Sequence, residues 1–320
     1  MMSPAGEIAT ASPFHEGEQR LQDITGVREV AEQRGRLMIR DHMPDQHRTF
    51  FEQLPFVLAG GLDATGQPWA TVWAGPPGFM RSPDPHRLHI GVRTLPGDPL
   101  AASWHEGSPI GLLGIEPHTR RRNRMNGTVR HLADGVVEVG VRQSFGNCPK
   151  YIRPRKAVWR GHAAGQAQVT QQSARLSAEA LRLIAGSDTF FIASASAGAG
   201  QPGQARGDGV DVSHRGGEPG FVHVTTTADA TELTVPDYAG NWMFNTLGNI
   251  LVQPRVGLVF IDVARGDVLW LAGQAWVDLD PQAAAAFEGA QRLLRVRIEQ
   301  GCLSHGVLPL TWEMPPVAQA

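Results

Sequence analysis

Short apolar runs separated by polar residues and turn residues extend over most of the chain, a pattern typical of β-strands joined by turns. Strands are predicted over 56–60, 68–74, 87–92, 110–116, 123–132, 136–142, 190–194 and 256–262. Apolar residues at helical spacing predict peripheral helices within 17–40, 46–54, 100–105, 173–184 and 243–251. The chain is therefore predicted to be mainly β, with helices at its periphery.

The same landmarks occur twice in the same order. Four segments of the second half correspond to four of the first: Phe190-Phe191-Ile192-Ala193-Ser194 to Phe56-Val57-Leu58-Ala59-Gly60, Gln201-Pro202 to Gln67-Pro68, Pro219-Gly220-Phe221 to Pro77-Gly78-Phe79, and 256–262 to 110–116. The offsets are 134, 134, 142 and 146 residues, so they drift only at loops. This pattern predicts two copies of one small β-barrel unit.

The repeat divides the chain into five parts. The predicted parts are a helical extension over 1–54, a first barrel over 55–142, a linker with a helix over 143–187, a second barrel over 188–280, and a C-terminal helix and tail over 281–320. Closely spaced strands with glycine turns favour barrels over a dinucleotide-binding fold. No GxGxxG follows a predicted strand and opens a helix.

Composition narrows the classes of function. The chain has 320 residues, 42% hydrophobic and 19% charged, with a formal net charge of −2. Near-neutral charge gives no general attraction for nucleic acid or anionic lipid, and no run reaches the roughly 18 apolar residues of a membrane helix. No signal segment opens the chain, and Cys148 and Cys302 lack CxxC spacing. We expect a cytoplasmic protein with no metal site and no nucleic-acid or membrane partner.

Two polar clusters carry the most chemistry, 211–217 and 236–242, each predicted where a short apolar strand ends. Arg215 offers a planar fork of donors, and Ser213 and Asn241 offer neutral donors. The predicted helix that follows Trp242 would add free N–H groups and partial positive charge at its N-terminus. These features predict a site for an anion such as a phosphate. The alternative is two solvated loops, because the same residue types are common in turns.

Three motifs connect the chain to a known family: 119–127 (TRRRNRMNG), 146–152 (GNCPKYI), and 211–217 followed by Pro219-Gly220-Phe221. With them, the chain from Phe14 to about Val277 resembles the FMN-binding split-barrel proteins of the pyridoxamine 5'-phosphate oxidase-like group, in particular the tandem double-barrel branch. The resemblance implies two tandem six-stranded split barrels with FMN between them. It implies these FMN-binding residues: Asp211, Val212, Ser213, His214, Arg215, Pro236, Asp237, Tyr238, Gly240, Asn241 and Asn245.

The sequence departs from the family at one point. Relatives commonly place an arginine or lysine in the turn after the third strand, where this chain has Asn241-Trp242-Met243. Arg215, His214 or the basic run 120–124 would have to compensate. That run has an alternative interpretation as a solvated turn with a hairpin at Asn126-Gly127. The aromatic residues considered for the flavin ring are Trp73, Phe79, Phe221, Trp242 and Trp276.

The resemblance implies an FMN-dependent oxidoreductase that acts on a small organic substrate or on a nicotinamide-derived electron source. The alternatives are a non-catalytic protein that stores or senses flavin, or one that binds haem or a deazaflavin in the same pocket. A separate electron-donor protein and a homodimer are both compatible with the sequence. Lys150, within Cys148-Pro149-Lys150-Tyr151, is the one candidate for a catalytic residue. The same segment could instead only lock the two barrels together.

Overall fold

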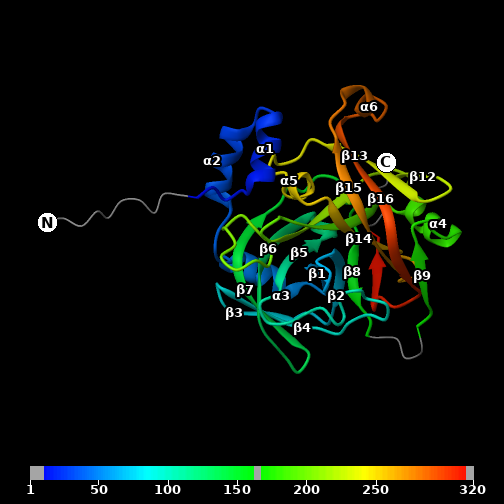
Figure 1. The fold of residues 1–320 in the computed structure, drawn as a ribbon. Helices are drawn as coiled ribbons and strands as arrows, with labels where there is room; N and C mark the ends of the chain where they lie inside the picture. The colour runs from blue at the N-terminus through cyan, green and yellow to red at the C-terminus, as the bar shows by residue number, and fades with distance from the viewer. Residues whose placement is uncertain (1–10, 162–166, 315–320) are drawn as a thin grey trace, which may run out of the picture.

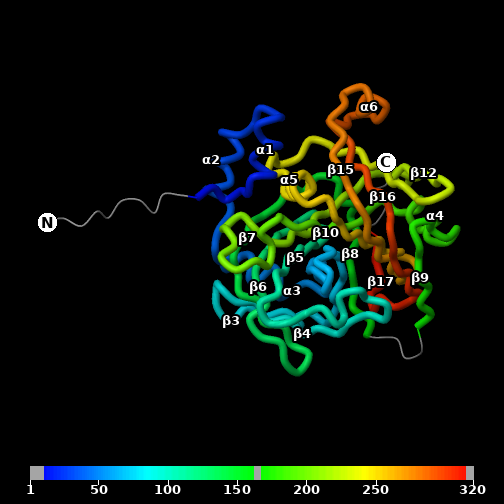
Figure 2. Tube along the Cα trace, in the orientation of Figure 1, coloured from blue at the N-terminus to red at the C-terminus, as the bar shows by residue number. Residues whose placement is uncertain are grey.

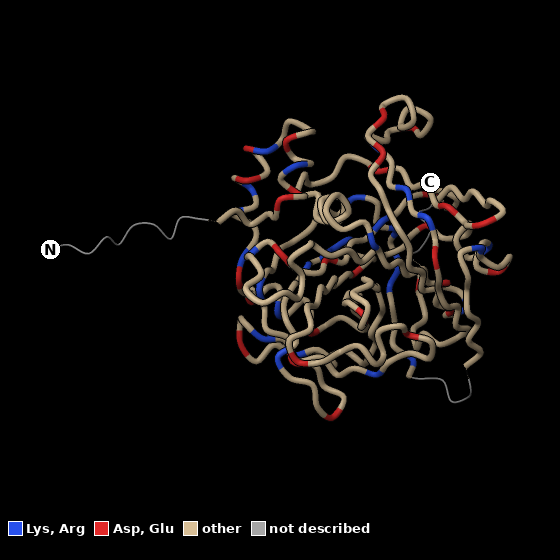
Figure 3. Tube along the Cα trace, viewed as in Figure 1, with Lys and Arg blue, Asp and Glu red and all other residues tan. Residues whose placement is uncertain are grey.

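The computed structural model describes residues 11–161 and 167–314, and the fold is mainly β, as predicted (Figure 1). Six α-helices lie at its periphery: α1 (Glu16–Ile24), α2 (Arg28–Met38), α3 (Asp45–Gln53), α4 (Ala178–Gly186), α5 (Asn245–Val252) and α6 (Pro281–Ala285). A short two-stranded sheet joins β8 (Lys156–Trp159) to β17 (Leu310–Glu313). Lysine and arginine positions are interspersed with aspartate and glutamate positions along the trace (Figure 3).

The first large sheet contains seven antiparallel strands in the order β2-β1-β5-β6-β7-β4-β3. Their bounds are β1 (Phe56–Leu62), β2 (Pro68–Ala74), β3 (Met80–Asp84), β4 (Arg87–Gly91), β5 (Pro109–Glu116), β6 (Arg121–Ala133) and β7 (Val136–Gly146). Strand β3 was not predicted, because it contains Pro83 and proline disfavours strands. The proline is tolerated there because β3 lies at the edge of the sheet.

The second large sheet follows the path β11-β10-β14-β15-β16-β13-β12, and β9 (Val169–Ser173) pairs with β16. The other bounds are β10 (Thr189–Ala195), β11 (Val210–Gly216), β12 (His223–Thr226), β13 (Thr231–Tyr238), β14 (Arg255–Ile261), β15 (Val268–Asp278) and β16 (Ala290–Ser304). Strand for strand this is the path of the first sheet, so the predicted duplication is confirmed. We call the two copies the first unit and the second unit.

Glycine packing shows the same equivalence. A Cβ added to Gly75 would lie 2.6 Å from the Cβ of Phe79, and one added to Gly217 would lie 2.6 Å from the Cβ of Phe221. The turns at 77–79 and 219–221 are therefore equivalent, as their sequences predicted. The Gln201-Pro202 landmark was wrong, because these two residues lie in the loop before β11, whereas Pro68 is the first residue of β2.

The first predicted landmark was displaced by one residue. Gly60 pairs with Gly111, and Ala193 pairs with the equivalent Gly257, so the strands correspond with an offset of 133 residues. The equivalent of Phe190 is therefore Val57 and not Phe56. A slip of one residue moves a side chain to the other face of a strand. Accordingly, Phe56 packs between the units, whereas Phe190 packs inside the second unit.

The two units pack through reciprocal contacts, as expected for a pseudo-twofold arrangement. Gly111 of the first unit lies so close to the carbonyl of Val210 that a Cβ would clash with it, and Gly257 lies in the same way against the carbonyl of Pro68. Apolar side chains from both units, including Trp69, form one buried cluster around these strands. The site described below depends on this junction.

The structure differs from the prediction at the C-terminus and at two loops. The range 281–320 was predicted as a helix and tail, but in its described part, 281–314, only the short α6 is helical, and β16 forms a central strand of the second sheet. Leu294, Val296 and Ile298 alternate with charged residues and face the core, which is a strand pattern. Residues 100–105 form turns and not a helix, and β7 runs to Gly146, beyond the predicted end of the first barrel at 142.

Helix α1 packs beside α5 (Figure 2). Gly17 of α1 meets Gly248 of α5, and a Cβ on Gly248 would lie 2.6 Å from the Cα of Glu18. No side chain fits between the two helices at this crossing. Helix α5 is therefore held on one side by the second unit and on the other by the N-terminal extension.

Candidate functional site

The first polar cluster lies inside a strand and not beyond its end, whereas the second spans the end of a strand, as predicted. Val210–Gly216 is strand β11, and 236–238 are the last three residues of β13. The register shows why: Asp211 pairs with Ser194, and Arg215 pairs with Phe190, in an uninterrupted antiparallel ladder. The predicted chemistry is thus fixed to a sheet, and only 239–244 form a loop.

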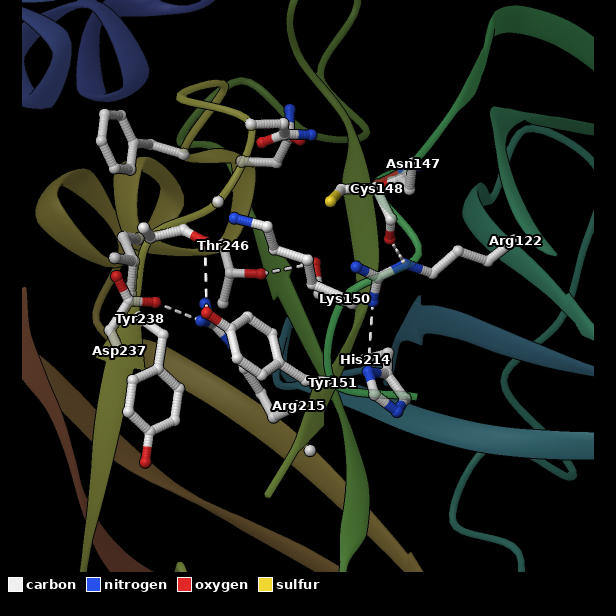
Figure 4. Close-up of a pocket in the computed structure, with 18 of the residues that line it drawn as sticks. Arg122, Asn147, Cys148, Lys150, Tyr151, His214, Arg215, Asp237, Tyr238 and Thr246 are labelled. Carbon is white, nitrogen blue, oxygen red and sulfur yellow. Dashed lines mark hydrogen bonds and ion pairs between the residues drawn. The ribbon is translucent and has the colours of Figure 1, made fainter. Parts of the chain in front are cut away.

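A pocket opens where these strands meet the first unit (Figure 4). The cavity measures about 130 Å³, and all the space between its walls, including open solvent, about 930 Å³. The lining residues from the second unit are 213–216, Phe221, 236–242 and 244–247; those from the first unit and the linker are Leu113, Arg122, Arg124, Asn147, Cys148, Lys150 and Tyr151. The pocket is therefore lined by both units and by the linker.

Nine of the eleven predicted cofactor-binding residues line this pocket: Ser213, His214, Arg215, Pro236, Asp237, Tyr238, Gly240, Asn241 and Asn245. Asp211 and Val212 do not. The Asp211 carboxylate is buried and accepts hydrogen bonds from Arg124 Nη1 at 2.9 Å, Asn126 Nδ2 at 2.8 Å and Asn249 Nδ2 at 2.9 Å. Val212 packs between the units. Asp211 thus holds both units and α5 together behind the pocket.

The basic run of the first unit reaches the pocket with every second residue. Arg122 and Arg124 lie on the same side of β6 and line the pocket, whereas Arg121 stacks on the Phe50 ring at 4.7 Å. Burial, followed by the charge of Arg124, lowers the pKa of Arg122 to about 10. The alternative of a solvated turn is correct only for Arg120, which is exposed. Asn126-Gly127 is not a hairpin turn, because it lies within β6 at a bulge.

Arg215 and Arg292 share Asp237, the only carboxylate in the lining among the described residues. Arg215 Nη1 contacts Asp237 Oδ1, and Arg292 Nε lies 3.7 Å from Asp237 Oδ2. Asp237 is therefore neutralised by two guanidinium groups. The lining also contains Arg122, Arg124 and Lys150. Arg124 is paired with Asp211 behind the pocket, so Arg122 and Lys150 are the cations of the lining without a carboxylate partner among the described residues. An electropositive pocket of this kind favours an anionic ligand.

Three buried donors of residues that line the pocket have no acceptor within the described part of the chain. They are Arg124 Nε, Arg215 Nε and Asn147 Nδ2. Buried donors are rarely left without a partner, because each such group costs about 1–3 kcal/mol. An oxygen-bearing ligand in the pocket would supply acceptors.

His214 is fully enclosed beside Arg122. Burial, followed by the charge of Arg122, lowers the pKa of His214 well below its usual range. A guanidinium only donates, so Arg122 Nη1 donates to His214 Nδ1 at 3.1 Å and the imidazole proton lies on Nε2. His214 is thus neutral at pH 7 and holds Arg122 in place. The carbonyl of Cys148 does the same by accepting from Arg122 Nε at 2.7 Å.

The N-terminus of α5 closes one side of the pocket. Asn245, Thr246 and Leu247 are its first three residues, and all three line the pocket. The first N–H groups of a helix have no intrahelical acceptor and favour anions. Thr246 Oγ1 donates to Ser213 Oγ at 2.7 Å, and Asn245 Nδ2 donates to Glu18 Oε1. The helix start is thus fixed to β11 and to α1. Sequence reasoning missed Thr246, although its place at a predicted helix start was the available signal.

Backbone strain gathers at the same pocket. Tyr151, Trp242 and Phe244 have φ values of 64°, 65° and 59°, and they are three of the five non-glycine residues with positive φ in the described segments. Bulky residues adopt this region at a cost of about 1–3 kcal/mol and often do so at functional sites. Tyr151 also stacks on Tyr238, with ring centroids 5.1 Å apart.

Of the aromatic residues considered for a ring, only Phe221 and Trp242 line the pocket. Trp73 is buried inside the first unit, Phe79 packs against the same core, and Trp276 is 40% exposed on β15. Lys150 is exposed in the lining, and Cys148 is a half-buried free thiol. Asn241, at the departure from the family pattern, accepts from the N–H of Met243 at 3.2 Å through Oδ1.

The equivalent place in the first unit is filled by tryptophan. The strand registers place Trp69 where the second unit has Asp211, Trp73 where it has Arg215, and Trp270 where the first unit has Arg124. All three indoles are buried. The duplicated fold therefore has one polar pocket at this junction and a packed core at the pseudo-symmetric position.

Within the residues that the structure describes, no group of three or more His, Cys, Asp or Glu side chains is placed to hold a metal ion. None of the described helices is long and apolar enough to cross a membrane.

Comparisons with known proteins give only partial structural likeness. No family model matches the chain, and no curated protein matches it. Solved structures that match include HupZ from group A Streptococcus (13% identical, covering 39% of this chain and 90% of that chain, TM-score 0.29). A second is the heme storage protein HutZ from Vibrio cholerae, which is 14% identical, covers 42% of this chain and 97% of its own, and has a TM-score of 0.26. A third is a putative pyridoxamine 5'-phosphate oxidase from Lactobacillus delbrueckii, which is 17% identical, covers 40% of this chain and 94% of its own, and has a TM-score of 0.28. These scores carry no conclusion about the function of this chain.

Proposed function

We propose that the pocket between the two units binds FMN and that the protein is an FMN-dependent oxidoreductase. The observation that carries the proposal is the set of charges and buried donors in the lining. Two of the four cationic side chains in the lining, Arg122 and Lys150, have no carboxylate partner among the described residues, and Arg124 Nε, Arg215 Nε and Asn147 Nδ2 have no acceptor there. A phosphate-bearing ligand supplies both the negative charge and the missing acceptors.

Residues from both units would hold the cofactor. Arg122, Arg215 and the first turn of α5 supply charge and donors for the phosphate, while Tyr238 and Trp242 supply aromatic surface for a ring. Each of these groups is already oriented by a neighbour: Arg122 by His214, Arg215 by Asp237, and α5 by Glu18. Such preorganisation reduces the ordering cost of binding.

FMN, when bound, supplies the hydride and one-electron chemistry that side chains lack. The protein would then bind, orient and tune it. Lys150 is the candidate for tuning, because its exposed ammonium in the lining would favour a negatively charged reduced flavin. The substrate class is a small organic molecule or a nicotinamide-derived electron source, and a separate electron-donor protein fits the same scheme.

The pocket is less suited to haem bound through histidine. His214 is the only histidine in the lining, and its Nδ1 already accepts from Arg122, so its Nε2 carries a proton. An iron ligand needs a free imidazole lone pair. The charge arrangement around the pocket therefore favours a flavin phosphate.

The test is the visible spectrum of the protein purified without added cofactor, with mass analysis of what heat releases. Flavin bands with released FMN are expected. Stopped-flow reduction by NADH or NADPH then separates an enzyme from a protein that only stores or senses flavin. If the protein is an enzyme, Lys150→Met should slow reduction of the flavin. An unchanged rate would indicate that 148–151 only lock the two units together. A colourless protein that also fails to take up added FMN would refute the proposal.

A further inference from the structure

A second pocket lies on the other side of His214. It is formed by the linker, the C-terminal end of α4, the turn between β14 and β15, and β17. The cavity measures about 270 Å³, about twice the 130 Å³ of the first pocket, and all the space between its walls, including open solvent, about 940 Å³. An apolar cavity of about 150 Å³ already holds a benzene ring, so the second pocket has room for a ligand of two fused rings.

The walls of the second pocket are mainly apolar. Large apolar side chains line it: Phe56, Ile115, Ile152, Phe191, Ile261 and Trp312. Phe56 and Trp312 meet edge to face with centroids 5.5 Å apart, which gives the wall a stepped aromatic surface. Small-molecule sites typically combine such walls with a few directed polar groups.

Two polar groups of the lining are free to bind a ligand. The indole Nε1 of Trp312 is buried and has no acceptor among the described residues. Arg182 is exposed at the pocket and has no ion-pair partner there, whereas Arg153 and Arg155 are paired with Glu218 and Asp188. The lining also contains the Asp262 carboxylate, which accepts hydrogen bonds from the N–H groups of Ala264 and Arg265. The groups without a partner among the described residues are thus one buried neutral donor and one exposed cation.

We propose that the second pocket binds a small, flat, largely apolar acid, such as an aromatic or alicyclic carboxylate. The ring system would lie against Phe56, Phe191 and Trp312, and the carboxylate would face Arg182. This assignment is independent of FMN, because His214 is the only residue that the two pockets share.

The shared histidine couples the two pockets. A ligand that packs on His214 from the second pocket changes the imidazole that holds Arg122 in the first. By linkage, any effect of this ligand on anion affinity in the first pocket is matched by an equal reverse effect. The second pocket is therefore suited to a substrate or an effector of the first.

The proposal is tested by titrating 2-naphthoate into the full-length protein in a calorimeter, with 2-naphthamide as the uncharged probe. We expect one naphthoate per chain, bound more tightly than the amide. Arg182→Gln should weaken naphthoate about tenfold, the effect of one charge-assisted hydrogen bond, and should leave the amide unchanged. Arg175→Gln, at an exposed arginine outside the pocket, should change neither.

A second variant blocks the space itself. Gly186 lines the pocket, and a Cβ added there meets no heavy atom within 4 Å. Gly186→Leu should abolish naphthoate binding in a protein with an unchanged melting curve, while Gly186→Ala should retain it. No binding to the natural protein, or binding that survives both Gly186→Leu and Arg182→Gln, would overturn the proposal. FMN titrations of the same variants report on the first pocket, so the two proposals fail separately.

Discussion

Arg215 illustrates how a single side chain serves both the fold and the proposed site. Its Nη1 contacts Asp237, while its Nε is buried at the pocket without an acceptor in the described chain. The Asp237 carboxylate prevents the guanidinium from turning away. A residue with one fixed bond and one free donor is suited to binding an anion with little loss of side-chain entropy.

Arg215→Ala should therefore weaken FMN binding by about 2 kcal/mol, roughly thirtyfold, because a charge-assisted contact is lost. Arg121→Ala is the matched control, because Arg121 belongs to the same basic run but does not line the pocket and instead stacks on Phe50. Flavin fluorescence titration measures both. Equal small losses in the two variants would mean that the phosphate is held elsewhere.

Asp98 gives a prediction for stability against pH. Burial raises the pKa of Asp98 to about 6, from 3.8 for an unperturbed group. The unfolded chain therefore loses this proton first, and the contribution of Asp98 to stability is full below about pH 4 and is lost as pH rises through 6. In the natural protein, the free energy of unfolding should fall by on the order of 2–3 kcal/mol between about pH 4 and pH 7 because of Asp98, and Asp98→Asn should remove this fall. Urea unfolding of both proteins at pH 4 and pH 7 measures this change. The same change in the free energy of unfolding for the natural protein and for Asp98→Asn would contradict the burial of the Asp98 carboxylate.

At the scale of elements, the crossing of α1 and α5 fixes one side of the site. Gly17 and Gly248 allow the helix backbones to meet, and Glu18 then reaches Asn245 at the first turn of α5. Burial raises the pKa of Glu18 well above its usual range, with the nearby Asp211 acting in the same direction. The N-terminal extension is thus part of the pocket's support.

Gly248→Ala should lower the free energy of unfolding by about 1–3 kcal/mol, because its Cβ would lie 2.6 Å from the Cα of Glu18 and the helices would have to separate. It should also weaken FMN, since the start of α5 moves with the helix. Gly186→Ala is the control, at a helical position whose Cβ meets nothing. Urea unfolding with both variants checks the difference, and equal stabilities would show that the crossing is not tight.

Element by element, the sequence predicted those features that depend on local pattern. The hairpin of 56–74, the peripheral helices and the repeat were predicted because apolar spacing and turn glycines are local signals. Strand β16 was missed because arginine and glutamate interrupt its apolar residues, and its alternation is clear only beside β13 and β15. In the pocket, the basic run 120–124 was predicted as a possible phosphate contact, but which of its arginines line the pocket, and that Asn147 joins them, depends on how the units pack.

For the whole molecule, the main feature is asymmetry within a duplicated fold. Reciprocal contacts at Gly111 and Gly257 retain the pseudo-twofold arrangement, yet only one of the two equivalent places is polar. At the other, Trp69, Trp73 and Trp270 are packed into cores. Duplication within one chain allows this difference, because the two copies can diverge independently.

One FMN per chain is therefore expected, not the two that a symmetric pair of units would hold. Absorbance of released flavin against protein concentration from amino-acid analysis measures the ratio. Trp270→Arg, which places a charge in the filled position, should destabilise the fold rather than create a second site, because a buried unpaired charge is costly. A ratio near two in the natural protein would contradict the filled site.

The most direct test of the central claim compares FMN with riboflavin in equilibrium titrations of the flavin-free protein. The two ligands share the ring and differ in the phosphate. An electropositive pocket with free buried donors predicts that FMN binds at least about tenfold more tightly and that salt weakens FMN more than riboflavin. Equal affinities for the two ligands, or no binding of either, would contradict a phosphate site formed by Arg122, Arg215 and the start of α5.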